Sequence, residues 1–290
     1  MKKAIYYTLL FLVVSMTAAL LASIVYAIIS GGSVTHTLGA DGTSDMPAEV
    51  TLTGTIVGNI ALIALFLSLH YCPVSRHYVR TKPWKVALWC CIASLGTILP
   101  SLWLEDHLSF LPDLTNGMKG MFGTPLGYLA IVVCAPICEE IVFRGAVIRA
   151  LMNWKPNVFV KPDEQSEACS SSAMARKGRM KSNWKLAVVI SALLFSIAHL
   201  NPAQMPHAFL LGLLLGWVFV RTGSVVPGII IHGVNNLTVY IIASSVPGIE
   251  DMSLADLYGG SEMKALLSVV FSLLILLPAL FQLHLNMKRE

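Results

Sequence analysis

The chain has 290 residues, of which 56% are hydrophobic and 12% are charged, and its mean hydropathy is +0.71. Soluble domains usually carry about 25% charged residues, so this composition excludes an ordinary soluble globular protein. Apolar stretches of about 20 residues, the length that crosses ~30 Å of hydrocarbon, recur along the whole sequence. We therefore predict an all-α fold, a polytopic transmembrane helical bundle.

Eight membrane spans are predicted, at about 4–30, 53–72, 85–104, 125–149, 185–200, 206–222, 225–247 and 264–286. The first span is longer than the roughly 7–15 apolar residues of a signal peptide, so we interpret it as a retained membrane anchor. The fifth span is short and ends near Asn201 and Pro202. In the sixth, the GxxxG spacing of Gly212 and Gly216 predicts close helix packing.

The basic residues indicate how the bundle is oriented. If both termini are cytoplasmic, only Lys119 and Lys264 fall outside, and the other Lys and Arg residues, apart from Arg144, fall on the cytoplasmic side. Cytoplasmic connections of membrane proteins are enriched in Lys and Arg. The net charge of +4 therefore reflects topology, and we expect the lipid bilayer rather than nucleic acid as the partner of these charges. We expect the protein in the plasma (inner) membrane.

We divide the chain into N-terminal transmembrane helices at 1–122, a central region at 123–243, and a C-terminal transmembrane helix at 244–290. The central region contains a polar, serine-rich segment at 151–184, which is predicted to be a cytoplasmic loop. The six cysteines show no paired metal-ligand spacing, so neither disulfides nor a structural zinc site are expected.

The fourth span contains three charged residues, although each charge at membrane depth costs a few kcal/mol (roughly 2.5–3.5). Glu140 and Arg144 are four residues apart, within ion-pair reach on one helix face. Glu139 is rotated by about 100° from Glu140 and about 140° from Arg144. We therefore predict that Arg144 neutralises Glu140 and that Glu139 faces a cavity.

Two other spans carry polar groups at the same spacing of four residues, Phe195 with His199 and His232 with Asn236. We predict that Glu139, His199, His232 and Asn236 converge on one polar cavity. A carboxylate and imidazoles exchange protons near neutral pH, and an asparagine amide stabilises a developing oxyanion. His199 falls toward the outer end of its span, so convergence requires a tilted or differently bounded fifth helix.

Five other histidines lie near span ends or in loops, where water or lipid headgroups are expected to solvate them. They are His70, His77, His107, His207 and His284. The other spans are comparatively plain, and we assign no polar site to them.

The three polar segments resemble the motifs of a known family. EEIVFR at Glu139–Arg144 matches EExxxR, FSIAH at Phe195–His199 matches FxxxH, and HGVNN at His232–Asn236 matches HxxxN. In this order and in apolar spans, they resemble the CAAX-protease and bacteriocin-processing family (CPBP, or ABI), which includes the Ras-converting CAAX prenyl endopeptidases. The resemblance covers about 123–243.

The resemblance implies an intramembrane endopeptidase whose active site opens toward the cytoplasmic side. It implies that Glu139 is the general base and that His199 helps to hold and polarise the attacking water. His232 and Asn236 would stabilise the oxyanion, with Glu140, Arg144 and Phe195 supporting the site.

Zinc would accept Glu139, His199 and His232 as ligands. However, the sequence has no HExxH helix, and the resemblance favours a glutamate-activated water. We therefore expect no metal and no other cofactor.

The expected substrate is a membrane-associated peptide or protein; whether it is prenylated is left open, as is the oligomeric state. An alternative hypothesis is a non-proteolytic immunity or scaffold protein on the same fold. A proton-coupled transporter is less favoured, because apart from His199 the outer halves of these spans offer few polar groups.

Overall fold

The structure is a computed structural model that describes residues 1–31, 46–72, 83–114, 120–152, 184–246, 248–249 and 252–287. Most of the predicted loop at 151–184 lies outside these residues, as does Cys169. The five cysteines within the described ranges are free thiols.

The described chain is helical and contains no strand, which confirms the predicted all-α class. Its helices are α1 (Lys2–Ser30), α3 (Ala48–Ser68), α4 (Pro83–His107), α5 (Pro125–Gly127), η3 (Tyr128–Cys134), α6 (Ala135–Glu139), η4 (Glu140–Ile148), α7 (Arg149–Met152), α8 (Trp184–Ala198), α9 (Met205–Thr222), α10 (Val226–Ser245), η7 (Asp256–Tyr258) and α11 (Glu262–Asn286). Segments α5 to α7 form one continuous helix from Pro125 to Met152, here called the central helix.

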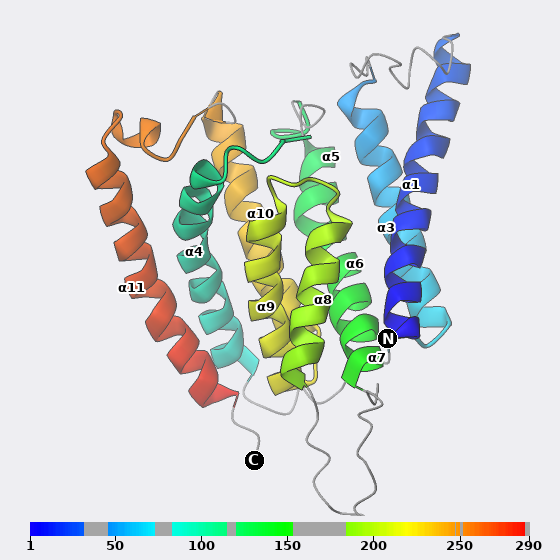
Figure 1. The fold of residues 1–290 in the computed structure, drawn as a ribbon. Helices are drawn as coiled ribbons and strands as arrows, with labels where there is room; N and C mark the ends of the chain where they lie inside the picture. The colour runs from blue at the N-terminus through cyan, green and yellow to red at the C-terminus, as the bar shows by residue number, and fades with distance from the viewer. Residues whose placement is uncertain are drawn as a thin grey trace, which may run out of the picture.

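Seven helices in the described ranges are long and apolar enough to cross a membrane, and α8, with 15 residues, is shorter. These helices correspond to the eight predicted spans. Successive spans run in opposite directions, so the start of α1 and the end of α11 lie at the same end of the bundle (Figure 1). The assignment of that end to the cytoplasm remains a prediction.

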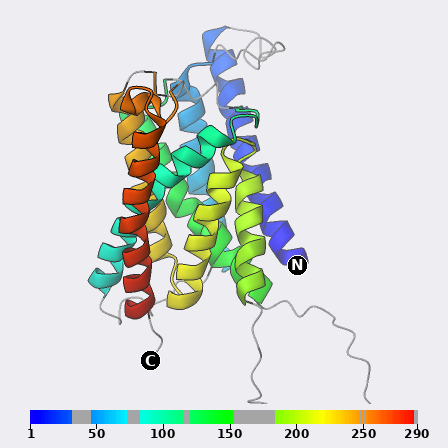
Figure 2. The same ribbon diagram turned by 60° about the vertical axis from the view of Figure 1, so that its left-hand side comes forward.

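The central helix, α8, α9 and α10 lie between two outer helix pairs. The pair α1 and α3 flanks them on one side and the pair α4 and α11 on the other (Figures 1 and 2). The residues predicted to form the site therefore lie on helices in the middle of the bundle.

Small residues bring neighbouring helices close together. A Cβ at Gly54 or Gly58 of α3 would lie 3.0 Å from the Cβ of Ala22 or Ala18 of α1. In membranes, such small-residue interfaces replace the hydrophobic driving force, because lipid tails are as apolar as the side chains.

The GxxxG pair of α9 packs in the same way, since Cβ atoms at Gly212 and Gly216 would lie 3.0 Å from Ala192 and 2.8 Å from Val188 of α8. The predicted close packing of the sixth span is confirmed. The α8–α9 hairpin is therefore tightly joined.

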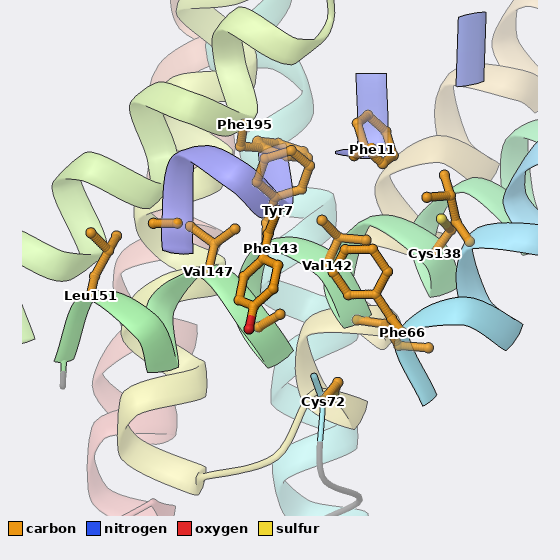
Figure 3. Packing of buried hydrophobic residues seen from close by; sticks show 14 of the residues in the cluster. Tyr7, Phe11, Phe66, Cys72, Cys138, Val142, Phe143, Val147, Leu151 and Phe195 are labelled. Atoms are coloured by element: carbon orange, nitrogen blue, oxygen red, sulfur yellow. The ribbon is translucent and has the colours of Figure 1, made fainter. Parts of the chain in front are cut away.

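Aromatic side chains fix the position of the central helix. The Phe143 ring is 5.4 Å from the Phe11 ring of α1 and 5.3 Å from the Phe195 ring of α8, both edge to face. Figure 3 shows Phe143 in the apolar cluster that also contains Tyr7 and Phe66. This packing holds the charged segment of the helix beside α8.

The central helix has two π-helical stretches, η3 and η4. At the end of η3, the N–H of Ala135 donates to the carbonyl of Ala130, five residues earlier. The next donor in this register would be residue 136, which is a proline and has no N–H. The carbonyl of Ile131 therefore lacks its partner within the helix. Interruptions of this kind are frequent at functional sites.

Candidate active site

The predicted ion pair of the fourth span is present. Arg144 Nη1 lies 2.8 Å from Glu140 Oε1, and both side chains are almost completely excluded from solvent. Arg144 also donates through Nη2 to the carbonyl of Gly212 at 3.4 Å, and its guanidinium lies 4.3 Å from the centre of the Phe195 ring. Arg144 therefore connects the central helix to both α8 and α9.

Glu140 also packs against α10. A Cβ at Gly228 would lie 2.4 Å from Glu140 Oε2 and 3.2 Å from its Cδ. The carboxylate thus occupies the space that a side chain at position 228 would need. Position 228 therefore requires a glycine, because a side chain there would overlap the Glu140 carboxylate.

His232 lies between the two glutamates. Its Nε2 is 3.8 Å from Glu139 Oε2, and its Nδ1 is 3.4 Å from Glu140 Oε1. The Glu139 side chain is 17% exposed and that of Glu140 is 0% exposed. Only Glu139 therefore combines a nearby imidazole with access for a small molecule such as water.

His199 reaches the same region because α8 is short. The helix ends at Ala198, and Leu200 adopts a positive φ of 54°, which turns the chain toward α9. The His199 and His232 rings contact the Phe195 ring edge to face, at 4.7 and 5.7 Å. The Phe195 ring therefore lies against both histidines, and the convergence of His199 with Glu139 stays a prediction.

The contacts of His199 also limit its chemistry. Its Nδ1 lies 2.8 Å from the carbonyl of Phe195, a geometry in which Nδ1 donates and Nε2 is the unprotonated nitrogen of the neutral ring. Nε2 is then the atom that accepts a hydrogen bond. This is the arrangement that a histidine needs to hold a water molecule.

Asn236 satisfies the free carbonyl of η3. Its Nδ2 donates to the carbonyl of Ile131 at 2.9 Å, the group that Pro136 leaves without a helical partner. A primary amide has two N–H donors, so this bond fixes the Asn236 side chain and leaves one donor. Asn236 is thereby attached to the helix that carries Glu139.

The expectation for His207 was wrong. His207 Nδ1 lies 2.7 Å from Ser101 Oγ of α4. A protein side chain rather than a headgroup therefore solvates this histidine. The third span was also described as plain, yet Thr97 and Ser101, spaced for one helix face, supply hydroxyls to this region. That spacing in the sequence is the signal that was missed.

A zinc site does not fit the arrangement of donors. In the part of the chain that the structure describes, no group of three or more His, Cys, Asp and Glu side chains is placed to bind a metal ion. Glu139 and His232 are near each other, but His199 is connected to His232 through the Phe195 ring. We derive no reaction step from a metal.

Comparison with known proteins matches the same part of the chain. Residues 122–238 match the family model of the Rce1-like type II CAAX prenyl endopeptidases, and this region includes every predicted site residue. Searches among curated proteins and among solved structures found no match. This match covers less than half of the chain, and it supports membership of the CAAX protease family.

Proposed function

We propose that this protein is an intramembrane endopeptidase that hydrolyses a peptide bond near the C-terminus of a membrane-associated substrate. The proposed catalytic core is 123–243, and the active site opens toward the cytoplasmic side of the plasma membrane. The family match supports peptidase activity of the CAAX type. The mechanism below rests on the contacts of the site.

The difference between two adjacent carboxylates carries this proposal. Glu140 is fully buried and paired with Arg144, whereas Glu139 is partly exposed and faces His232 Nε2. A carboxylate that is already held by a guanidinium is a poor proton acceptor. Glu139 is therefore the proposed general base.

In the proposed reaction, a water molecule donates one proton to Glu139 while His199 Nε2 holds its other hydrogen. The resulting hydroxide attacks the carbonyl carbon of the scissile bond. His232 and the second N–H of Asn236 donate to the oxyanion of the tetrahedral intermediate. Glu139 then transfers its proton to the leaving amine as the C–N bond breaks, which restores the carboxylate.

The test compares Glu139→Gln with wild type in lipid nanodiscs. The probes are two internally quenched peptides that end in Cys-aliphatic-aliphatic-X, one farnesylated on cysteine and one not. Loss of a general base costs about 10²- to 10⁴-fold, and we expect kcat to fall by this amount with an unchanged melting temperature. Glu262→Gln, in the first turn of α11, is the matched control and should cleave normally.

The outcomes separate the alternatives. Normal cleavage by Glu139→Gln would remove Glu139 from the mechanism. A wild-type protein that cleaves neither probe, with a cellular phenotype that survives Glu139→Gln, would favour the non-proteolytic immunity or scaffold protein. The ratio of the two cleavage rates shows whether a prenyl group is recognised. Stoichiometric zinc that is lost together with activity on chelation would contradict the metal-free mechanism.

A further inference from the structure

A second polar cluster joins α4, α9 and α10 beside the glutamates. His207, in the first turn of α9, contacts Ser101 Oγ through Nδ1 at 2.7 Å. This bond joins the start of α9 to α4.

This cluster continues along α4 and reaches α10 twice. Asn235 Nδ2 donates to Thr97 Oγ1 at 3.3 Å, and Thr97 Oγ1 donates to the carbonyl of Ser94 at 2.7 Å. Ser94 Oγ in turn donates to the carbonyl of Ile231 at 2.7 Å. Ser94 is fully buried and Asn235 is 2% exposed, so these bonds form away from water.

The two attachment points on α10 flank His232. Ile231 directly precedes it, and Asn235 follows three residues later, less than one helical turn away. A shift of α10 along its axis would have to break both attachments. The cluster therefore sets the height of His232 relative to Glu139 and Glu140.

His207 is suited to holding rather than to proton transfer. Its hydrogen bond is to the Ser101 hydroxyl, a neutral group. In the described residues, the ion-pair contacts with Glu139 and Glu140 come from His232 and Arg144.

We propose that His207 is a positioning residue. Through its bond to Ser101 it steadies α4, the helix that holds α10 at Ile231 and Asn235, and so it keeps His232 between the two glutamates. The consequence for catalysis rests on the proposed peptidase function, whereas the effect on His232 itself does not. A misplacement of about 1 Å costs on the order of 10²-fold in rate. His207 therefore governs kcat while leaving substrate binding nearly unchanged.

The first experiment measures His232 directly, without any substrate. Full-length protein in nanodiscs is labelled with ¹⁵N-histidine, and the imidazole signals of His232 are identified by their loss in His232→Gln. We expect His207→Leu to shift these signals and His207→Gln, whose amide can bond Ser101, to restore them. The control is His107→Leu, because His107 bonds the Trp103 carbonyl outside the cluster. Unchanged His232 signals in His207→Leu would overturn the proposal.

The second experiment uses the cleavage assay. We expect His207→Leu to lower kcat by roughly 10- to 100-fold with KM changed less than threefold, and His207→Gln to recover most of the rate. Equal loss in both variants, or a loss confined to KM, would also overturn the proposal. If the wild type cleaves no probe, the peptidase function fails, and the His232 signals still decide whether His207 positions that ring.

Discussion

The substitution Gly228→Ala tests whether the buried ion pair depends on the bare backbone of α10. The added Cβ would lie 2.4 Å from Glu140 Oε2 and 3.2 Å from its Cδ. Real Cβ atoms do not approach so closely, so either the carboxylate or α10 must move. Because Arg144 Nη1 holds the same carboxylate at 2.8 Å, movement of the carboxylate weakens the ion pair.

The size of the stability loss depends on whether α10 or the Glu140 carboxylate moves. If α10 shifts, the cost is that of overpacking, about 1–3 kcal/mol. If the carboxylate leaves Arg144, the cost approaches that of a broken buried pair, about 3–5 kcal/mol. For a chain of this size each kcal/mol lowers Tm by roughly 2–4 °C, so we expect a loss on the order of 5–10 °C. Cleavage should fall as well, because His232 lies one turn further along α10.

The assay follows the thermal exposure of buried thiols in detergent, since Cys90 and Cys138 are fully buried and free. The matched control is Gly233→Ala on the same helix, where the nearest atom to an added Cβ is the Val132 carbonyl oxygen at 3.6 Å. This control should melt at or above the wild-type temperature, because alanine favours helix. Equal melting temperatures for Gly228→Ala and Gly233→Ala would refute the reasoning.

Two further substitutions test other close contacts of the central helix. Gly145→Ala places a Cβ 2.2 Å from Cys72 Sγ, so we expect a stability loss of about 1–3 kcal/mol, partly recovered in the double variant with Cys72→Ala; no recovery would contradict the contact. Pro136→Ala supplies an N–H that competes with Asn236 for the Ile131 carbonyl. We expect it to keep or raise Tm while lowering kcat by roughly tenfold or more, and a variant with wild-type kcat would contradict the role assigned to Pro136.

Patterns in the sequence predicted the spans and the ion pair because both depend on local rules. Hydrocarbon thickness sets span length, and the spacing of Glu140 and Arg144 brings them together on any helix of this kind. The same angular argument separated Glu139 from Glu140. These features needed no knowledge of the neighbouring helices.

The second polar cluster depends on how helices are placed against one another. His207 was assigned to headgroups because it lies near the start of its span. However, the start of α9 packs against α4, where Ser101 Oγ lies 2.7 Å from His207 Nδ1. The bond from Asn236 to the Ile131 carbonyl likewise depends on the helix register. In a regular α-helix this carbonyl would accept from the N–H four residues later, whereas in the π-helical register its donor would be residue 136, a proline without an N–H.

The buried ion pair contacts one glycine on α9 and one on α10. Gly212 of α9 offers its carbonyl to Arg144, and Gly228 of α10 leaves space for Glu140. A buried pair adds little net stability, because desolvation offsets most of its attraction. Its contacts reach both neighbouring helices, since α9 offers a backbone carbonyl to Arg144 and α10 leaves space for Glu140 only at a glycine. We infer that Glu140 and Arg144 align the helices that carry His207 and His232 with the helix that carries Glu139.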